Sequence, residues 1–323
     1  MVPDPATVER FRADLDALIA PGTPLGLAVS GGADSLALLL LATAVRPDEV
    51  EAATVDHGLR QGSAEEAEQV GEFCAHMGVP HTVLRVEWDL PPSSAIQELA
   101  REVRYGALAE WMHERSLDAV ATGHHLDDQA ETLIMRLNRG SGVRGLSGMR
   151  PLASVPGHPD LQLLRPLLGW TRAELEQVCS DAGIQPMEDP SNSDDRYERV
   201  RTRAALVNAD WLDRPGLAKS AANLADADDA VEWAAALEWT RFAEVAAGEI
   251  AYRPSNAPDE ILRRIVARAV EELGTEGAPD DLRGSELDRL LGSLREASVA
   301  TLRGVRCEGG EVWRFTRAAP RRA

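Results

Sequence analysis

The chain has 323 residues, of which 44% are hydrophobic, and this composition is typical of a globular protein with about two domains. No apolar run approaches the roughly 20 residues of a membrane-spanning helix, and the first residues lack the basic and apolar regions of a signal peptide, so we expect a cytoplasmic protein without a membrane partner. The formal charge of −19 excludes nonspecific nucleic-acid binding by the chain as a whole, because phosphate neutralisation needs clustered cations.

Strand and helix patterns alternate through the first part of the chain. Apolar runs predict strands at 25–29, 50–55, 81–86 and 119–122, and the stretches between and after them predict helices at 36–45, 65–77, 94–115 and 126–139. Such alternation predicts an α/β fold with a doubly wound, Rossmann-like parallel sheet. Ligands bind to these sheets at the carboxyl ends of the strands.

The rest of the chain has a different character. The glycine-rich stretch 140–148 and the proline-containing stretch 151–166 are predicted as loops, and alanine-rich segments predict helices at 215–247, 258–272 and 282–294. Alternation on both sides of Gly309 and Gly310 predicts a terminal β-hairpin. We therefore predict one domain over residues 1–210 and a mainly helical domain over residues 211–323.

The segment SGGADS, residues 30–35, stands between the first strand and the next helix. Free amides and the positive end of the helix dipole attract anions there, Gly31 and Gly32 let a phosphate approach closely, and Ser30 and Ser35 add hydroxyl groups. The segment is neither a Walker loop nor a GxGxxG fingerprint, since the spacing differs and the first 218 residues contain no lysine. Taken alone, it fits a phosphate site and a plain turn equally well.

Three more motifs place this segment in a wider pattern: VDHGLR (55–60), ATGHHLDDQAET (121–132) and PSNSDDRYERVRTR (190–203). SGGADS resembles the pyrophosphate loop of the PP-loop ATP pyrophosphatases, and the four motifs together, over about residues 24–205, resemble the tRNA(Ile)-lysidine synthetase family. The family's Arg-Asn-x-Ile-Arg pattern is here Arg199-Val200-Arg201-Thr202-Arg203, so no role of that asparagine is transferred to Val200.

The resemblance implies a ligase that forms a carbon–nitrogen bond on tRNA. ATP adenylates the wobble cytidine of an isoleucine tRNA with a CAU anticodon at the oxygen on carbon 2, and pyrophosphate leaves. L-lysine then attacks that carbon, AMP leaves, and lysidine is formed. ATP and Mg²⁺ are the implied cofactors, the domain over residues 211–323 is expected to contact the tRNA, and a homodimer is compatible with the sequence.

The resemblance also implies which residues bind ATP. Amide donors and magnesium would spread the charge of the departing pyrophosphate. The expected ATP-binding residues are Ser30, Gly31, Gly32, Asp34, Ser35, Asp56, His57 and His124. Asp34 would hold the metal or steer lysine, and a helix N-cap is the structural alternative for it.

Carboxylates gather in the helix that follows the fourth strand. Asp127, Asp128 and Glu131 would lie close together at helical spacing, and magnesium or the lysine ammonium would relieve their repulsion. A solvated acidic first turn is the alternative. The expected catalytic residues are Asp34, Asp127, Asp128, Glu131 and Arg203, and Asp128 and Glu131 are also expected to contact lysine.

Arginines supply the remaining expected substrate contacts. Arg101 and Arg104 would face the phosphates or the flipped cytidine, with exposed ion pairs to nearby glutamates as the alternative. Arg199, Arg201 and Arg203 would contact the RNA backbone or the adenylate, with pairing to neighbouring acidic residues as the alternative.

Two other functions compete with this interpretation. One is a different PP-loop ATP pyrophosphatase, such as an amidotransferase-like ligase, and the other is a nucleotide-binding sensor without turnover. A tRNA thiolase would need paired cysteines, whereas Cys74, Cys179 and Cys307 are far apart. A zinc site at His124 and His125 is disfavoured because no HxxxH or cysteine partner is nearby.

Overall fold

The computed structural model describes residues 3–59, 62–88, 96–187, 194, 196–274, 282 and 284–318. The chain forms two compact units, unit 1 with Met1–Asn138 and Gly148–Ala221, and unit 2 with Arg139–Ser147 and Ala222–Ala323. The boundary predicted at 210/211 lies before helix α9 (Arg214–Phe242), whereas the units divide within α9. The first turns of α9 stay with unit 1 because Arg214 binds Asp127 and Ala221 lies against Gly148.

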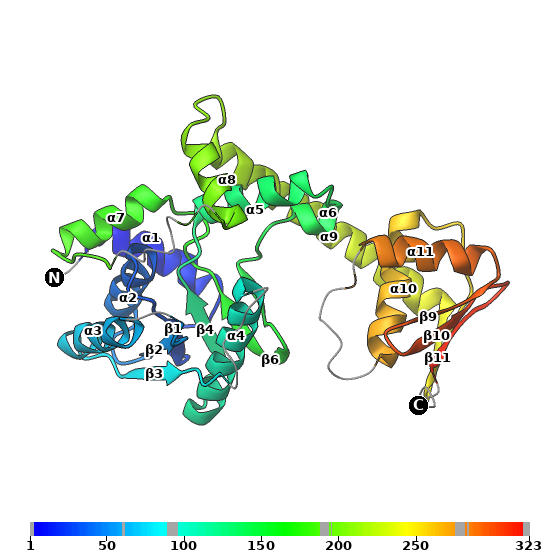
Figure 1. Cartoon of the computed structure of the whole chain (residues 1–323), viewed down its shortest axis with the longest axis horizontal. Helices are drawn as coiled ribbons and strands as arrows, with labels where there is room; N and C mark the ends of the chain where they lie inside the picture. Colours follow the sequence, from blue (N-terminus) through cyan, green and yellow to red (C-terminus); the bar gives the residue numbers. More distant parts are fainter. Residues whose placement is uncertain are drawn as a thin grey trace. The chain divides into compact units, whose positions relative to one another are not determined.

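Unit 1 contains a six-stranded sheet in the order β3-β2-β1-β4-β6-β5 (Figure 1). The predicted strands form its parallel part as β1 (Leu25–Ala28), β2 (Val50–Asp56), β3 (His81–Arg85) and β4 (Ala119–Thr122). Two further strands extend it: β6 (His158–Leu164) runs parallel to β4, and β5 (Leu152–Val155) pairs antiparallel with β6.

The prediction of a loop over 151–166 was wrong. Its prolines are compatible with the two strands, because Pro151 precedes β5, Pro156 lies in the turn and Pro166 follows β6. Pro159 lies where the register of the pair shifts, which is a position in a sheet that tolerates proline.

Helices cover both faces of this sheet, as predicted for a doubly wound fold (Figure 1). One face packs on α1 (Pro5–Asp16), α2 (Ala33–Val45), α3 (Ser63–His76) and α7 (Arg172–Asp181). The other face packs on α4 (Ile96–Arg115), whose Trp111 is buried against the strands. The sheet therefore has a nonpolar layer on each side.

Unit 2 has its own core and a five-stranded antiparallel sheet in the order β7-β8-β11-β10-β9. The strands are β7 (Ala243–Ala246), β8 (Glu249–Tyr252), β9 (Val299–Leu302), β10 (Val305–Glu308) and β11 (Trp313–Arg317). They pack with α10 (Asp259–Leu273) and α11 (Gly284–Arg295). The predicted terminal hairpin is β10–β11, but it belongs to this larger sheet.

Two further sequence expectations for unit 2 need correction. The helix predicted through residue 247 ends at Phe242, because 243–252 forms a hairpin that turns at Gly248 with a φ of +81°. The glycine-rich stretch predicted as a loop contains the short helix α6 (Val143–Leu146). Although α9 runs for 29 residues, no helix in the described part of the chain combines the length and the apolar character needed to cross a bilayer.

The strand order reverses in the middle of the unit 1 sheet. From β1 the chain continues to β2 and β3 on one side, and β4 and β6 lie on the other, so the carboxyl ends of β1 and β4 are adjacent. Gly123, directly after β4, packs against the start of α2, and a Cβ atom there would lie 2.9 Å from the carbonyl carbon and oxygen of Asp34. The loops after β1 and β4 therefore form one continuous surface.

This close approach predicts that Gly123→Ala destabilises unit 1. The added methyl group must push the backbone of α2 away, and such overpacking costs about 1–3 kcal/mol in the free energy of unfolding. The matched control is Gly106→Ala inside α4. Apart from the helix's own backbone and the chain neighbours, no described atom lies within 4 Å of the new Cβ there, and this variant should gain roughly 0.5–1 kcal/mol. Urea unfolding measures both changes, and equal unfolding free energies would contradict the proposed contact.

Candidate active site

The loop between β1 and α2 is folded by its own serines. The Ser35 hydroxyl accepts a hydrogen bond from the Ser30 amide at 3.1 Å and donates one to the Gly32 carbonyl at 3.0 Å. Gly31 has a φ of +87°, which favours glycine, and its carbonyl accepts from the Met187 amide at 3.0 Å. Within the described residues no side chain caps the start of α2, so the amides of Ala33 and Asp34 are available to an anion.

Asp34 lies in the first turn of α2 and does not cap it, because the N-cap position is Gly32. Its Oδ2 is 3.4 Å from Nε2 of His125. Its Oδ1 is buried and has no hydrogen-bond partner in the described part of the chain. A buried carboxylate oxygen without a partner costs free energy, so this atom is suited to receive a cation.

His125 is the buried centre of the acidic group. Its Nε2 lies 3.6 Å from Oδ2 of Asp128, and its Nδ1 lies 3.6 Å from Oδ2 of Asp127. Burial by itself would lower the pKa of His125, but its hydrogen bonds to Asp127 and Asp34 outweigh burial and raise that pKa to about 10. These carboxylate contacts favour the positive imidazolium at neutral pH, whereas the Asp127 amide, which points to Nδ1 at 3.2 Å, favours a ring with an unprotonated Nδ1. From the sequence, His125 was expected only as one of a histidine pair that could contact a nucleotide phosphate or move a proton, and its contacts with three carboxylates were not predicted.

Asp127 has both carboxylate oxygens occupied by other elements. Oδ2 accepts from the Arg172 amide at 2.9 Å, and Oδ1 accepts from Nη1 of Arg214 at 2.8 Å. The hydrogen bond to His125, with these two, holds the pKa of Asp127 well below its usual range. Asp127 thus ties α5 (Leu126–Asn138) to the first turns of α7 and α9.

Glu131 is 2% exposed and binds two arginines of helix α8 (Glu198–Val207). Its Oε1 accepts from Nε of Arg203 at 2.6 Å, and its Oε2 accepts from Nε of Arg199 at 3.1 Å. Both guanidinium groups also come within 3.8 Å of Oδ1 of Asp128. The chain's own cations therefore already relieve the repulsion that was expected to need magnesium or lysine, and Asp128 is less tightly engaged than Glu131.

The other expected site residues lie in different settings. The Arg201 side chain donates to the Arg196 carbonyl at 2.9 Å and is exposed. Asp56, at the end of β2, accepts from the Gly58 amide at 2.9 Å, and the His57 carbonyl next to it accepts from Trp88 at 2.6 Å. Arg60 and residues 190–193 and 195 of the quoted motifs lie outside the described residues.

His124 contrasts with its neighbour His125. Its Nδ1 is 2.7 Å from the Thr122 hydroxyl, and burial together with nearby Arg165 and Arg104 lowers its pKa well below the usual value. His124 is therefore neutral at the pH where His125 is charged.

The two arginines expected at the site from α4 lie beside an aromatic ring. The guanidinium groups of Arg101 and Arg104 lie 4.9 and 5.2 Å from the ring centre of Tyr105.

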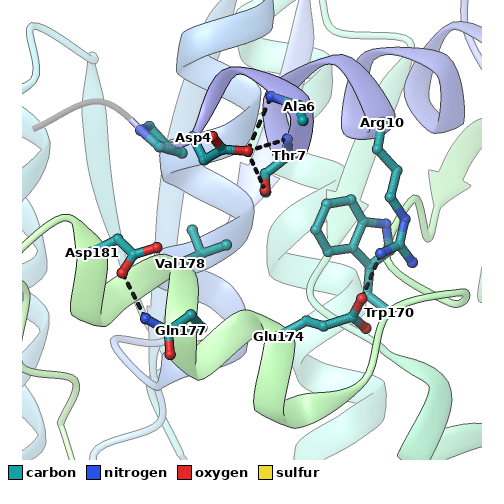
Figure 2. A pocket seen from close by; sticks show the side chains of 10 residues that line it. Asp4, Ala6, Thr7, Arg10, Trp170, Glu174, Gln177, Val178 and Asp181 are labelled. Carbon is teal, nitrogen blue, oxygen red and sulfur yellow. Dashed lines mark hydrogen bonds and ion pairs between the residues drawn. The ribbon is translucent and has the colours of Figure 1, made fainter.

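A separate pocket between α1 and α7 contains none of the expected site residues (Figure 2). Arg10 lies over the indole ring of Trp170, 4.0 Å from its centre, and binds Glu174 at 2.6 Å. The Trp170 carbonyl accepts a hydrogen bond from the Leu126 amide at 2.8 Å, so Trp170, which lines this pocket, also supports the first turn of α5. We assign the pocket a supporting role. In the described residues, no group of three metal-ligating side chains has the arrangement of a metal site.

Comparisons with known proteins show the family and the fold of the chain. The PP-loop domain family matches residues 7–210. A tRNA(Ile)-lysidine synthase of Novosphingobium aromaticivorans is 49% identical over 97% of this chain and 94% of its own length, and one of Zymomonas mobilis is 44% identical over 92% and 89%. The solved tRNA thiolase NcsA of Methanococcus maripaludis shares the fold, with a TM-score of 0.56 at 20% identity over 68% of this chain and 76% of that one.

The two adjacent histidines should titrate in opposite directions. In the metal-free protein, NMR signals of the His125 ring should remain those of an imidazolium from pH 5 to beyond pH 8, whereas the His124 ring should stay neutral, and His124→Gln and His125→Gln assign the signals. Because the pKa of His125 is raised from 6.5 to about 10, its charge stabilises the folded state fully below pH 6.5, and this stabilisation is lost as the pH rises toward 10. Titration of both rings near pH 6.5 would contradict the geometry.

Proposed function

The chain belongs to the tRNA(Ile)-lysidine synthase family, and on this premise we propose that the crevice at the ends of β1 and β4 carries out both steps of that reaction. ATP adenylates the wobble cytidine of the CAU-anticodon isoleucine tRNA, and L-lysine then displaces AMP. The observation that carries the proposal is that the uncapped start of α2 and the buried acidic group around His125 adjoin one another.

The β and γ phosphates of ATP bind at the start of α2 in this proposal. The amides of the first turn and the hydroxyls of Ser30 and Ser35 supply donors for the departing pyrophosphate. Mg²⁺ in proteins is commonly held by one or two carboxylates together with substrate phosphates, and the unpartnered Oδ1 of Asp34 fits that role. When bound, the ion would neutralise charge on the pyrophosphate. Asp56, His57 and His124 adjoin the nucleotide.

The lysine ammonium binds at Oδ1 of Asp128, since the Oδ2 atoms of Asp34 and Asp128 face Nε2 of His125. Glu131 is bonded to two arginines, and Asp127 to Arg214 and to the Arg172 backbone amide, so their role is to position α8, α7 and α9 around the site. Oδ1 of Asp128 lies 3.8 Å from Nη2 of Arg199 and 3.8 Å from Nη2 of Arg203, which is farther than the bonds that these arginines make to Glu131. Lysine must lose a proton before its amine attacks, and a carboxylate at this place can accept that proton.

Basic side chains of α4 and α8 receive the RNA. Arg199 and Arg203 reach from α8 toward the acidic group, and Arg201 is exposed on the same helix. Exposed arginines bind RNA phosphates through their charge and forked geometry. We extend the proposal to unit 2 as a second tRNA-contacting unit. Dimer formation and a cytoplasmic location stay predictions.

The assay for this function is incorporation of labelled lysine into CAU-anticodon isoleucine tRNA in the presence of ATP and Mg²⁺. Asp34→Asn should lower incorporation about a hundredfold or more, because a carboxylate that binds a cation or moves a proton contributes on that scale. The matched control is Asp160→Asn at the start of β6, where Asp160 binds the exposed His113. Undiminished incorporation by Asp34→Asn would remove Asp34 from the site, and absence of incorporation by the wild-type protein would refute the function.

Glu131 and Asp128 should respond differently to the same change. Glu131→Gln loses the charge that binds both arginines, so the free energy of unfolding should fall by about 1–3 kcal/mol. Asp128→Asn should raise the KM for lysine with a smaller loss of stability, because its carboxylate is less tightly bonded. Steady-state kinetics measures the KM for lysine, and urea unfolding measures the stability. If Asp128→Asn lost more stability and Glu131→Gln raised the KM, Glu131 would be the residue that contacts lysine.

A further inference from the structure

Met187 contacts the pyrophosphate loop, residues 30–35, from outside, and it was not among the residues expected at the site. Its backbone amide donates to the Gly31 carbonyl at 3.0 Å. Its side chain covers the same glycine, since a Cβ atom at Gly31 would lie 2.8 Å from Sδ of Met187 and 3.1 Å from Cγ2 of Val70 in α3. Met187 therefore holds Gly31 with its main chain and its side chain together.

The bond from Met187 sets the direction of the next amide in the loop. The peptide between Gly31 and Gly32 is trans, and in a planar trans peptide the carbonyl and the N–H point in opposite directions. Because the Gly31 carbonyl points to Met187, the Gly32 amide points to the other side, and it has no partner among the described residues. An amide that faces a phosphate attracts it, whereas a carbonyl oxygen in its place would repel it.

The loop's own bonds do not fix this peptide. The φ of Gly31, +87°, is a conformation that glycine adopts readily, but glycine also adopts others at little cost. The Ser35 hydroxyl bonds to the Ser30 amide and to the Gly32 carbonyl, and neither bond reaches the Gly31 carbonyl. Met187 supplies the restraint that these bonds leave out.

Helix α7, which precedes Met187, anchors the loop at a second point. The thiol of Cys179 in α7 donates to the Ala33 carbonyl at 3.4 Å, and burial raises the pKa of this thiol to about 11, so it keeps its proton at neutral pH. At its other end, α7 donates through the Arg172 amide to Oδ2 of Asp127. The chain from α7 to Met187 therefore connects the pyrophosphate loop to the acidic group.

We propose that Met187 is a positioning residue that aims the Gly32 amide at the departing pyrophosphate. The inference rests on the proposed binding of the ATP phosphates at the start of α2. In this role Met187 contacts neither ATP nor lysine and acts through the peptide between Gly31 and Gly32. Pyrophosphate gains negative charge as it leaves with the electron pair of the bond to the α-phosphorus, so an amide that is already aimed stabilises this step.

Ordinary core packing is the alternative role for Met187. The residue is half-buried and packs against the core of unit 1. Packing alone would make a substitution costly for stability without a selective loss of pyrophosphate binding. The bond from the Met187 amide favours the positioning role, because a side chain that only fills space needs no bond from its own main chain to the loop.

The test measures binding of inorganic pyrophosphate by calorimetry, the KM for lysine in the incorporation assay, and the free energy of unfolding in urea. Met187→Pro removes the amide donor and should weaken pyrophosphate binding about tenfold, the scale of one hydrogen bond to a charged group, with the KM for lysine unchanged. Met187→Ala keeps the donor but uncovers Gly31, so it should weaken pyrophosphate binding by a smaller factor. Met187→Leu refills the space and should bind pyrophosphate like the wild type.

The matched control is Met77→Ala, because Met77 is a half-buried methionine of the same core at the end of α3 and no described contact joins it to the pyrophosphate loop. This variant should lose stability and bind pyrophosphate like the wild type. Unchanged pyrophosphate binding in Met187→Pro, or an equal loss in Met77→Ala, would overturn the inference.

Two further outcomes keep the test decisive. If Met187→Pro does not fold, Met187→Ala takes its place, and pyrophosphate binding equal to that of Met187→Leu would then overturn the inference. Should the variants behave as expected while the wild-type protein incorporates no lysine, the proposed function would fail and the positioning role of Met187 would remain.

Discussion

Repulsion between carboxylates at the start of α5 is the constraint on which the site depends. Asp127, Asp128 and Glu131 are all buried there, with Asp34 nearby on α2. Buried charges of one sign are tolerated only when opposite charges are bonded to them, and His125, Arg199, Arg203 and Arg214 provide these. Because Arg199 and Arg203 come from α8 and Arg214 from α9, the same ion pairs that make the acidic group stable also hold these two helices against the start of α5.

The compensation is incomplete at Asp34. One oxygen of Asp34 has no partner in the described residues, which leaves a place for a cation beside the pyrophosphate loop. His124, next to the charged His125, has its pKa lowered by burial and nearby arginines. In this account, ATP and lysine complete the charge balance that the protein leaves open, although the chain as a whole carries −19.

The sequence predicted much of the fold because β1 to β4 are apolar runs that end at polar motifs. It therefore predicted that SGGADS and the motif after β4 share one edge of the sheet. It missed β5 and β6, since prolines at strand ends and at a register shift look like loop residues. The division of labour among the carboxylates was not predictable, because it depends on Arg172, Arg199 and Arg214, which are distant in sequence and become neighbours only through helix packing.

The central claim is that polyphosphate and lysine occupy one crevice, with amides on one wall and carboxylates on the other. A crystal structure of the protein with a non-hydrolysable ATP analogue, Mg²⁺ and L-lysine tests this most directly. The account predicts the terminal phosphates at the first turn of α2 and the lysine amine within hydrogen-bonding distance of Asp34 or Asp128. Lysine bound at a site remote from these carboxylates, with the phosphates still on α2, would contradict it.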